Sequence, residues 1–131
     1  MIRALPLLLL LAACAARPAE RDPLAGRIAG EPQDCIPVSS QNVSPQVIDA
    51  NTILYREGAG RRIWRTGPTG ACPALGRTPP VTLINIVWGG RLCRNDRFQV
   101  LEPGVSIPSA FCFYQQFTPY DLPPETKERS G

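Results

Sequence analysis

The sequence predicts an all-β domain: a small disulfide-stapled barrel or two-sheet sandwich of about five to seven short strands. Short runs rich in β-branched and aromatic residues recur along the middle of the chain. Between them lie many of the 15 prolines and 11 glycines found among the 131 residues, which favour turns over long elements. No segment of about ten residues has apolar side chains at helical spacing, so no long helix is expected.

The expected strands follow one another at short intervals. The segment 81–88, VTLINIVW, is the strongest, because β-branched and aromatic residues fill it. Segment 57–60 contains glycine and is expected to be a hairpin loop, and Gly89-Gly90 turns the chain into 91–93. The remaining strands are expected at 46–49, 52–56, 62–66, 97–101 and 110–117.

The N-terminus resembles a secretory signal peptide. In residues 1–13, Arg3 precedes an apolar run that is too short to cross a bilayer as a mature helix. The run ends in Leu11-Ala12-Ala13-Cys14, which resembles a bacterial lipobox, so we expect lipid (palmitate) attachment at Cys14. Ala15 favours the periplasmic face of the outer membrane. The alternative is an ordinary secretory signal that is cleaved nearby.

The mature chain is expected to have three parts. Residues 14–33 mix Ala, Pro, Gly and both charge signs, which predicts a lipidated flexible tether. Residues 34–118 form the β domain. Residues 119–131 are polar and rich in proline, and are expected to be a disordered tail.

Four cysteines remain besides Cys14, and an even number in a small exported domain indicates two disulfides. We favour Cys72–Cys93, which would tie the loops around the strongest strand, and Cys35–Cys112, which would join the domain's ends. The alternatives are Cys35–Cys72 with Cys93–Cys112, and Cys35–Cys93 with Cys72–Cys112. No C-x₂-C pair is present, so neither a zinc site nor a redox site is expected.

Several short motifs together resemble one protein family. They are Cys35-Ile36, Val47-Ile48-Asp49, the segment 52–56, Trp64-Arg65, Ala71-Cys72-Pro73 with Leu75, Gly90-Arg91-Leu92-Cys93 with Asp96, and Cys112. The group is an uncharacterised proteobacterial family of small secreted proteins and lipoproteins, and the resemblance covers about residues 34–118. It implies an exported four-cysteine β domain and no catalytic role.

Arginines crowd the first hairpin beside two aromatic residues. Because side chains alternate along a strand, Arg62 and Trp64 should share one face and Arg65 the other. A binding edge for carboxylates or phosphates, made by Arg56, Arg62, Trp64 and Arg65, is one interpretation. The alternative is a solvent-exposed hairpin whose charged side chains prevent pairing with the edge strand of another molecule, with Trp64 in the core.

Three other polar residues have a structural interpretation and a functional one. Asp49 and Asp96 are expected in turns, although a pair of close carboxylates would suit a hydrolase. Asn85 shares a strand face with apolar residues of segment 81–88. We expect its side chain to be buried and hydrogen-bonded to a structural partner. The alternative is that it contacts a ligand.

The composition narrows the function. The chain has no histidine, which removes the usual catalytic base and metal ligand, and we expect no cofactor and no metal. Its net charge of +3, or +2 once Arg3 is removed with the signal, is too small for a nucleic-acid binder. We expect a non-catalytic module that binds an envelope protein or glycan in the periplasm. One alternative is an inhibitor of a lytic enzyme such as lysozyme. Such inhibitors carry a Ser-Gly-x-x-Tyr element, and segment 50–55 of this chain lacks its Ser-Gly pair. The other alternative is an enzyme of unrecognised type.

Overall fold

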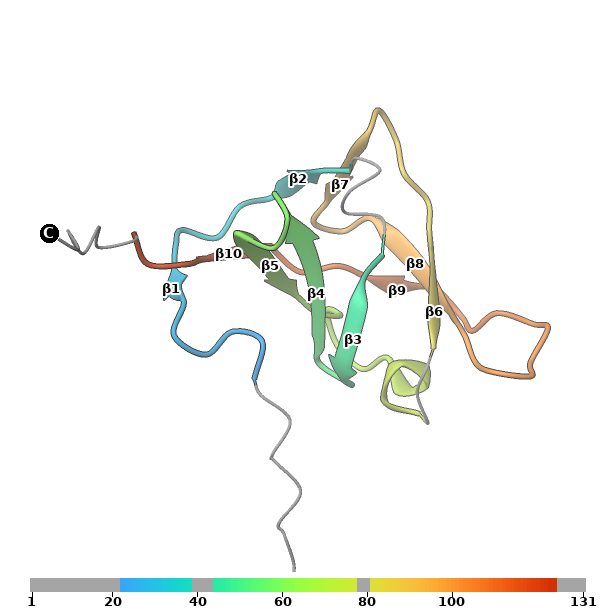
Figure 1. Ribbon diagram of the computed structural model, residues 1–131. Helices are drawn as coiled ribbons and strands as arrows, with labels where there is room; N and C mark the ends of the chain where they lie inside the picture. The colour runs from blue at the N-terminus through green and yellow to red at the C-terminus, as the bar shows by residue number, and fades with distance from the viewer. Residues whose placement is uncertain (1–21, 39–43, 78–80, 125–131) are drawn as a thin grey trace, which may run out of the picture.

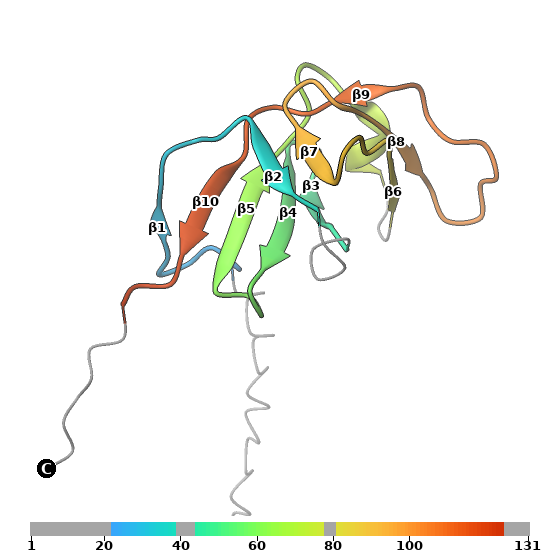
Figure 2. The same cartoon turned by 90° about the horizontal axis from the view of Figure 1, so that it is seen from above.

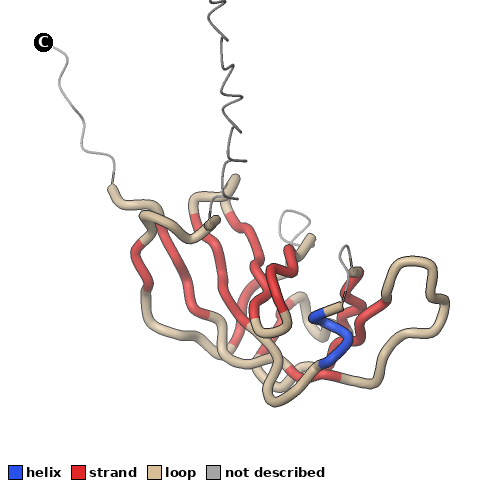
Figure 3. The backbone as a smooth tube through the Cα atoms, turned by 90° about the horizontal axis from the view of Figure 1, so that it is seen from below, coloured by secondary structure: helices blue, strands red, loops and turns tan. Residues whose placement is uncertain are grey.

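The computed structural model describes residues 22–38, 44–77 and 81–124. The expected signal peptide, the expected lipidation site at Cys14 and residues 125–131 of the expected tail lie outside these ranges. The described strands are β1 (Ile28–Ala29), β2 (Cys35–Pro37), β3 (Gln46–Asp49), β4 (Thr52–Glu57), β5 (Arg62–Thr66), β6 (Thr82–Asn85), β7 (Arg91–Cys93), β8 (Arg97–Leu101), β9 (Cys112–Phe113) and β10 (Thr118–Asp121). A single short 3-10 helix, η1 (Pro73–Gly76), lies among them (Figure 3).

The all-β class is confirmed, with more and shorter strands than expected. The ten described strands form three antiparallel sheets, with the orders β1-β10-β5-β4-β3, β6-β8-β9 and β2-β7, and they do not close into a barrel. The five-stranded sheet forms one side of the molecule and the sheet β6-β8-β9 lies at the other end (Figures 1 and 2).

Most of the strands lie at the positions that the alternation of side chains predicted. Strands β3, β5 and β8 have the expected bounds, and β4 is one residue longer. Strand β6 ends at Asn85, three residues earlier than expected, and the expected turn follows at Gly89 and Gly90, both with positive φ. The expected strand 110–117 is paired as a strand only at β9.

The five-stranded sheet extends beyond the expected limits of the domain. Strand β1 lies in the segment assigned to the tether, and β10 lies mostly in the segment assigned to the tail, yet the two strands pair with each other. Strand β10 also pairs with β5. The two ends of the folded chain therefore add two strands to the sheet, because each offers backbone groups that the other can bond.

The core lies between the sheets and is rich in aromatic rings. Tyr114 lies 4.4 Å from Phe98 and 5.7 Å from Phe117, measured between ring centroids. The buried residues of this core are Ile36, Ile53, Tyr55, Trp64, Cys72, Leu75, Leu92, Phe98, Val100, Tyr114 and Phe117. They come from all three sheets and from η1, so burial of these side chains holds the sheets together.

Two buried tyrosines and the half-buried Asn85 form a closed ring of hydrogen bonds at the edge of this core. The Asn85 amide donates to the Tyr55 hydroxyl at 3.0 Å, and the Tyr114 hydroxyl donates to Asn85 Oδ1 at 2.5 Å. The two tyrosine hydroxyls lie 2.7 Å apart, so Tyr55 can donate to Tyr114 and complete the ring. Burial raises the pKa of both tyrosines above the usual value. Asn85 therefore has the structural partners that were expected, although its side chain is half-buried and not fully buried.

The two disulfides form, but the favoured pairing is wrong. The bonds are Cys35–Cys93, with Cα atoms 4.0 Å apart, and Cys72–Cys112, with Cα atoms 6.0 Å apart. Cys35 and Cys93 face each other because β2 pairs with β7, and not with a strand near the C-terminus. This interleaved pairing was the second of the two alternatives.

Candidate binding surface

Two of the four residues predicted for the hairpin edge are engaged by the fold. Arg62 forms a bidentate pair with Asp121 of β10, with N···O distances of 2.7 and 2.9 Å, and its guanidinium lies 5.3 Å from the centre of the Trp64 ring. The hydrogen bond from Arg62 lowers the pKa of Asp121. Trp64 is 2 % exposed, and its indole N–H donates to Glu57. Trp64 therefore lies in the core, as the alternative interpretation expected.

The other two residues lie on the opposite face of the hairpin. In the register of the strands, Arg56 pairs with Ile63 and Arg65 pairs with Leu54, so these side chains share the face that Trp64 does not. Arg56 donates to Gln46 at 3.1 Å. Arg65 is exposed and makes no hydrogen bond or ion pair with the described residues. The four residues therefore do not converge on one site.

The two aspartates stabilise turns, as expected: Asp49 ends β3 before the turn at residues 50–51, and Asp96 ends the turn before β8. Asp49 Oδ1 accepts a hydrogen bond from the backbone N–H of Asn51 at 2.8 Å. Asp96 Oδ2 accepts from the backbone N–H of Cys93 at 2.7 Å, in a turn where Asn95 has a φ of 69°. Each carboxylate thus fixes its own loop, as acidic side chains commonly do in turns.

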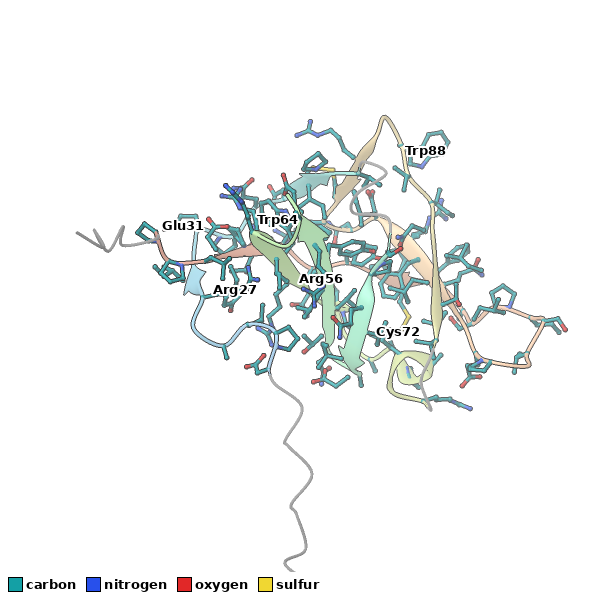
Figure 4. The ribbon with its side chains drawn as sticks, viewed as in Figure 1. Arg27, Glu31, Arg56, Trp64, Cys72 and Trp88 are labelled. Atoms are coloured by element: carbon teal, nitrogen blue, oxygen red, sulfur yellow. A yellow bond between two sulfur atoms is a disulfide. The ribbon has the colours of Figure 1, made fainter. Side chains whose placement is uncertain are left out.

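The main exposed apolar surface was not predicted. Most large apolar side chains that remain exposed belong to residues 84–113: Ile84, Val87, Trp88, Val105, Ile107, Phe111 and Phe113. Trp88 is 75 % exposed and projects away from the body of the protein (Figure 4). Exposed apolar side chains point to a binding site only where they lie side by side on one surface.

Part of this surface is the outer face of the sheet β6-β8-β9. Ile84 pairs with Gln99, and Arg97 pairs with Phe113, so these four side chains point to the same side of the sheet. The inner face carries Phe98 and Val100 and is buried in the core. We call Ile84, Arg97, Phe111 and Phe113 the aromatic face.

The aromatic face carries a positive charge. The guanidinium of Arg97 lies 5.1 Å from the centre of the Phe111 ring, a cation–π contact. The acids that flank β8 are already engaged, since Asp96 bonds to the backbone and Glu102 forms an ion pair with Arg77 at 3.5 Å. The surface therefore combines exposed rings with a cation that lacks an anionic partner among the described side chains.

One signal for this face was present in the sequence. Segment 81–88 has apolar residues at both odd and even positions, which means that both faces of its strand are apolar. Such a strand is usually buried on both sides, but here only one side meets the core. The sequence of the segment does not indicate which of the two faces packs on the core and which stays exposed to solvent.

The tyrosine that corresponds to the lysozyme-inhibitor element does not project from the surface. Tyr55 is 1 % exposed and bonds to Tyr114 and Asn85. An inhibitory tyrosine would have to reach into the cleft of an enzyme, so the position of Tyr55 gives no support to the inhibitor hypothesis.

Comparison with protein-family models, curated proteins and solved structures finds no match to this chain. Among the described residues, no helix has the length and apolar character needed to span a bilayer. The same residues contain no group of three or more His, Cys, Asp or Glu side chains arranged to hold a metal ion. The fold and the surface define a class: a small all-β domain with two interleaved disulfides and one uncovered aromatic sheet face.

Proposed function

We propose that this protein is a bacterial envelope lipoprotein, anchored through Cys14, whose β domain is a non-catalytic binding module in the periplasm. The N-terminal sequence supports the anchor, because a short apolar run leads directly to Leu11-Ala12-Ala13-Cys14. Two disulfides in a small domain suit an oxidising compartment. The observation that carries the binding role is the exposed aromatic face.

The partner of this face is a protein with an apolar surface and acidic groups at its edge. Exposed aromatic rings and arginine are the side chains most enriched at protein interfaces. Arg97 would meet a carboxylate of such a partner while Phe111 and Phe113 pack against apolar side chains. A second copy of the chain fits less well, because a face-to-face dimer would bring two Arg97 cations into one interface.

The anchor is tested by replacing Cys14. The full-length wild-type chain should remain in the membrane fraction of its own bacterium, and intact mass spectrometry should show a chain that begins at Cys14 and carries added acyl mass. The Cys14→Ala chain should move to the soluble fraction, because no acyl chain would hold it. A mature wild-type N-terminus at Ala15 or later would contradict the anchor.

The binding role is tested by photo-crosslinking in the same bacterium. A benzoylphenylalanine at position 113 should give one discrete protein adduct, and the same group at exposed Arg61 should not. In the chain that carries the probe at 113, Arg97→Glu should reduce the adduct at least ten-fold, whereas Arg97→Lys should retain most of it, because lysine keeps the positive charge. An adduct with a glycan, an adduct between two copies of the chain, or an adduct that is indifferent to Arg97→Glu would contradict the proposal.

A further inference from the structure

A hollow lies on the face of the five-stranded sheet that is opposite to the core. Its volume is about 480 Å³, within the range of small-molecule sites. Leu54, 1 % exposed, and Thr52, 8 % exposed, form its base. The full lining is Asp22, Leu24, Ile48, Asp49, Thr52, Leu54, Arg65 and Tyr120.

One wall of the hollow is the segment just before β1, which Arg27 fixes in place (Figure 4). The Arg27 guanidinium donates to the carbonyl oxygens of Pro23, Gly60, Arg61 and Tyr120, at distances of 2.7 to 3.4 Å. These bonds join the segment to the β4–β5 hairpin and to β10. The wall is therefore built into the fold, although the sequence predicted a tether there.

The hollow is lined by one positively charged side chain and two negatively charged ones, and they form no ion pairs with one another. Arg65 on β5 forms no ion pair with the carboxylate of Asp22 or with that of Asp49 in the described structure. Each carboxylate uses one oxygen to fix its own turn: Asp22 accepts from the backbone N–H of Leu24 at 3.0 Å, and Asp49 from that of Asn51 at 2.8 Å. The turns hold both side chains in place and leave the second oxygen of each free for a ligand.

We propose that this hollow binds a zwitterionic amino acid or a short peptide with free ends. The carboxylate of the ligand would meet the guanidinium fork of Arg65, and its ammonium group would lie between Asp22 and Asp49. An apolar side chain of the ligand would pack between Leu24 and the exposed Ile48. A simple anion would be repelled by the two carboxylates, and a simple cation would leave Arg65 without a partner, so a ligand with both charges fits best.

The test uses the full-length chain in detergent and the dipeptide leucyl-alanine, followed by isothermal titration calorimetry. Leucyl-alanine should bind, and both N-acetyl-leucyl-alanine and leucyl-alanine amide should bind at least ten-fold more weakly, because each lacks one charge. Arg65→Gln and Asp49→Asn should each weaken binding about ten-fold. The asparagine keeps a side-chain oxygen for the bond from Asn51, so the turn is preserved.

Arg56→Gln is the matched control, because Arg56 lies on the same face of the sheet but outside the hollow. It should leave the affinity for leucyl-alanine unchanged. The proposal is overturned if leucyl-alanine does not bind, if the acetylated or amidated form binds equally well, or if Arg56→Gln weakens binding as much as Arg65→Gln does. None of these outcomes depends on Cys14 or on the aromatic face.

Discussion

Replacement of Cys72 and Cys112 together by alanine is expected to lower the free energy of unfolding by about 3–4 kcal/mol. The bond joins residues 40 positions apart, so its loss frees a long loop in the unfolded chain. In the folded chain it ties the start of η1 to β9, which has only two residues. Few backbone hydrogen bonds hold either element, so a large loss is expected.

Denaturation in guanidinium at neutral pH, with the oxidised wild-type chain as reference, measures this effect. The Cys35→Ala, Cys93→Ala chain is the matched control: its bond spans 58 positions, which predicts a similar loss of about 4 kcal/mol. A loss below about 1 kcal/mol in both double variants would show that the disulfides do not stabilise the fold. A Cys35–Cys112 peptide in a non-reducing digest would contradict the pairing itself.

Tyr114→Phe is expected to destabilise the protein at neutral pH and to make it less sensitive to alkali. The variant removes the hydroxyl that donates to Asn85 Oδ1 and lies beside the Tyr55 hydroxyl. Asn85 Oδ1 then loses its donor and the Tyr55 hydroxyl loses the acceptor for its hydrogen, which costs about 1–3 kcal/mol. The aromatic ring remains, so its packing against Phe98 is preserved. The decrease in the free energy of unfolding therefore measures the contribution of the Tyr114 hydroxyl.

The alkaline effect follows from the raised pKa of the two buried tyrosines. In the unfolded chain a tyrosine loses its proton near pH 10, whereas the folded chain holds that proton to higher pH. The stability that the proton provides is therefore complete below about pH 10 and falls as the pH rises above it. One such group contributes at most about 1.4 kcal/mol per pH unit, when it is ionised in the unfolded chain and still protonated in the folded chain.

Guanidinium titrations between pH 8 and pH 11 measure both parts of the prediction. The stability of the wild-type chain should fall as the pH rises above about 10, and that of the Tyr114→Phe chain should fall less steeply, since one of the two buried tyrosines is gone. Equal slopes for the two chains would show that Tyr114 does not hold its proton through burial in the folded protein.

The sequence alone determined the all-β class and the place of most strands. The bounds of β3, β5 and β8 follow from local signals, because apolar and polar side chains alternate within each strand and turn residues flank it. The turn at Asp49 was predictable for the same reason, since its carboxylate bonds to an N–H only two residues away. Asn85 could also be placed in the interior from the apolar side chains that share its face.

Apart from the β4–β5 hairpin, only the tertiary structure decided which strands lie side by side, and the binding surfaces depend on those pairings. Arg62 looked free in the sequence but is paired with Asp121, 59 residues away. Cys35 meets Cys93 because β2 lies beside β7, and cysteine spacing does not specify strand order. The aromatic face is exposed because the described part of the fold covers only one side of β6-β8-β9. The local pattern of apolar and polar residues determines whether a segment forms a strand. Which strands it pairs with depends on how the apolar side chains of the whole domain are buried together.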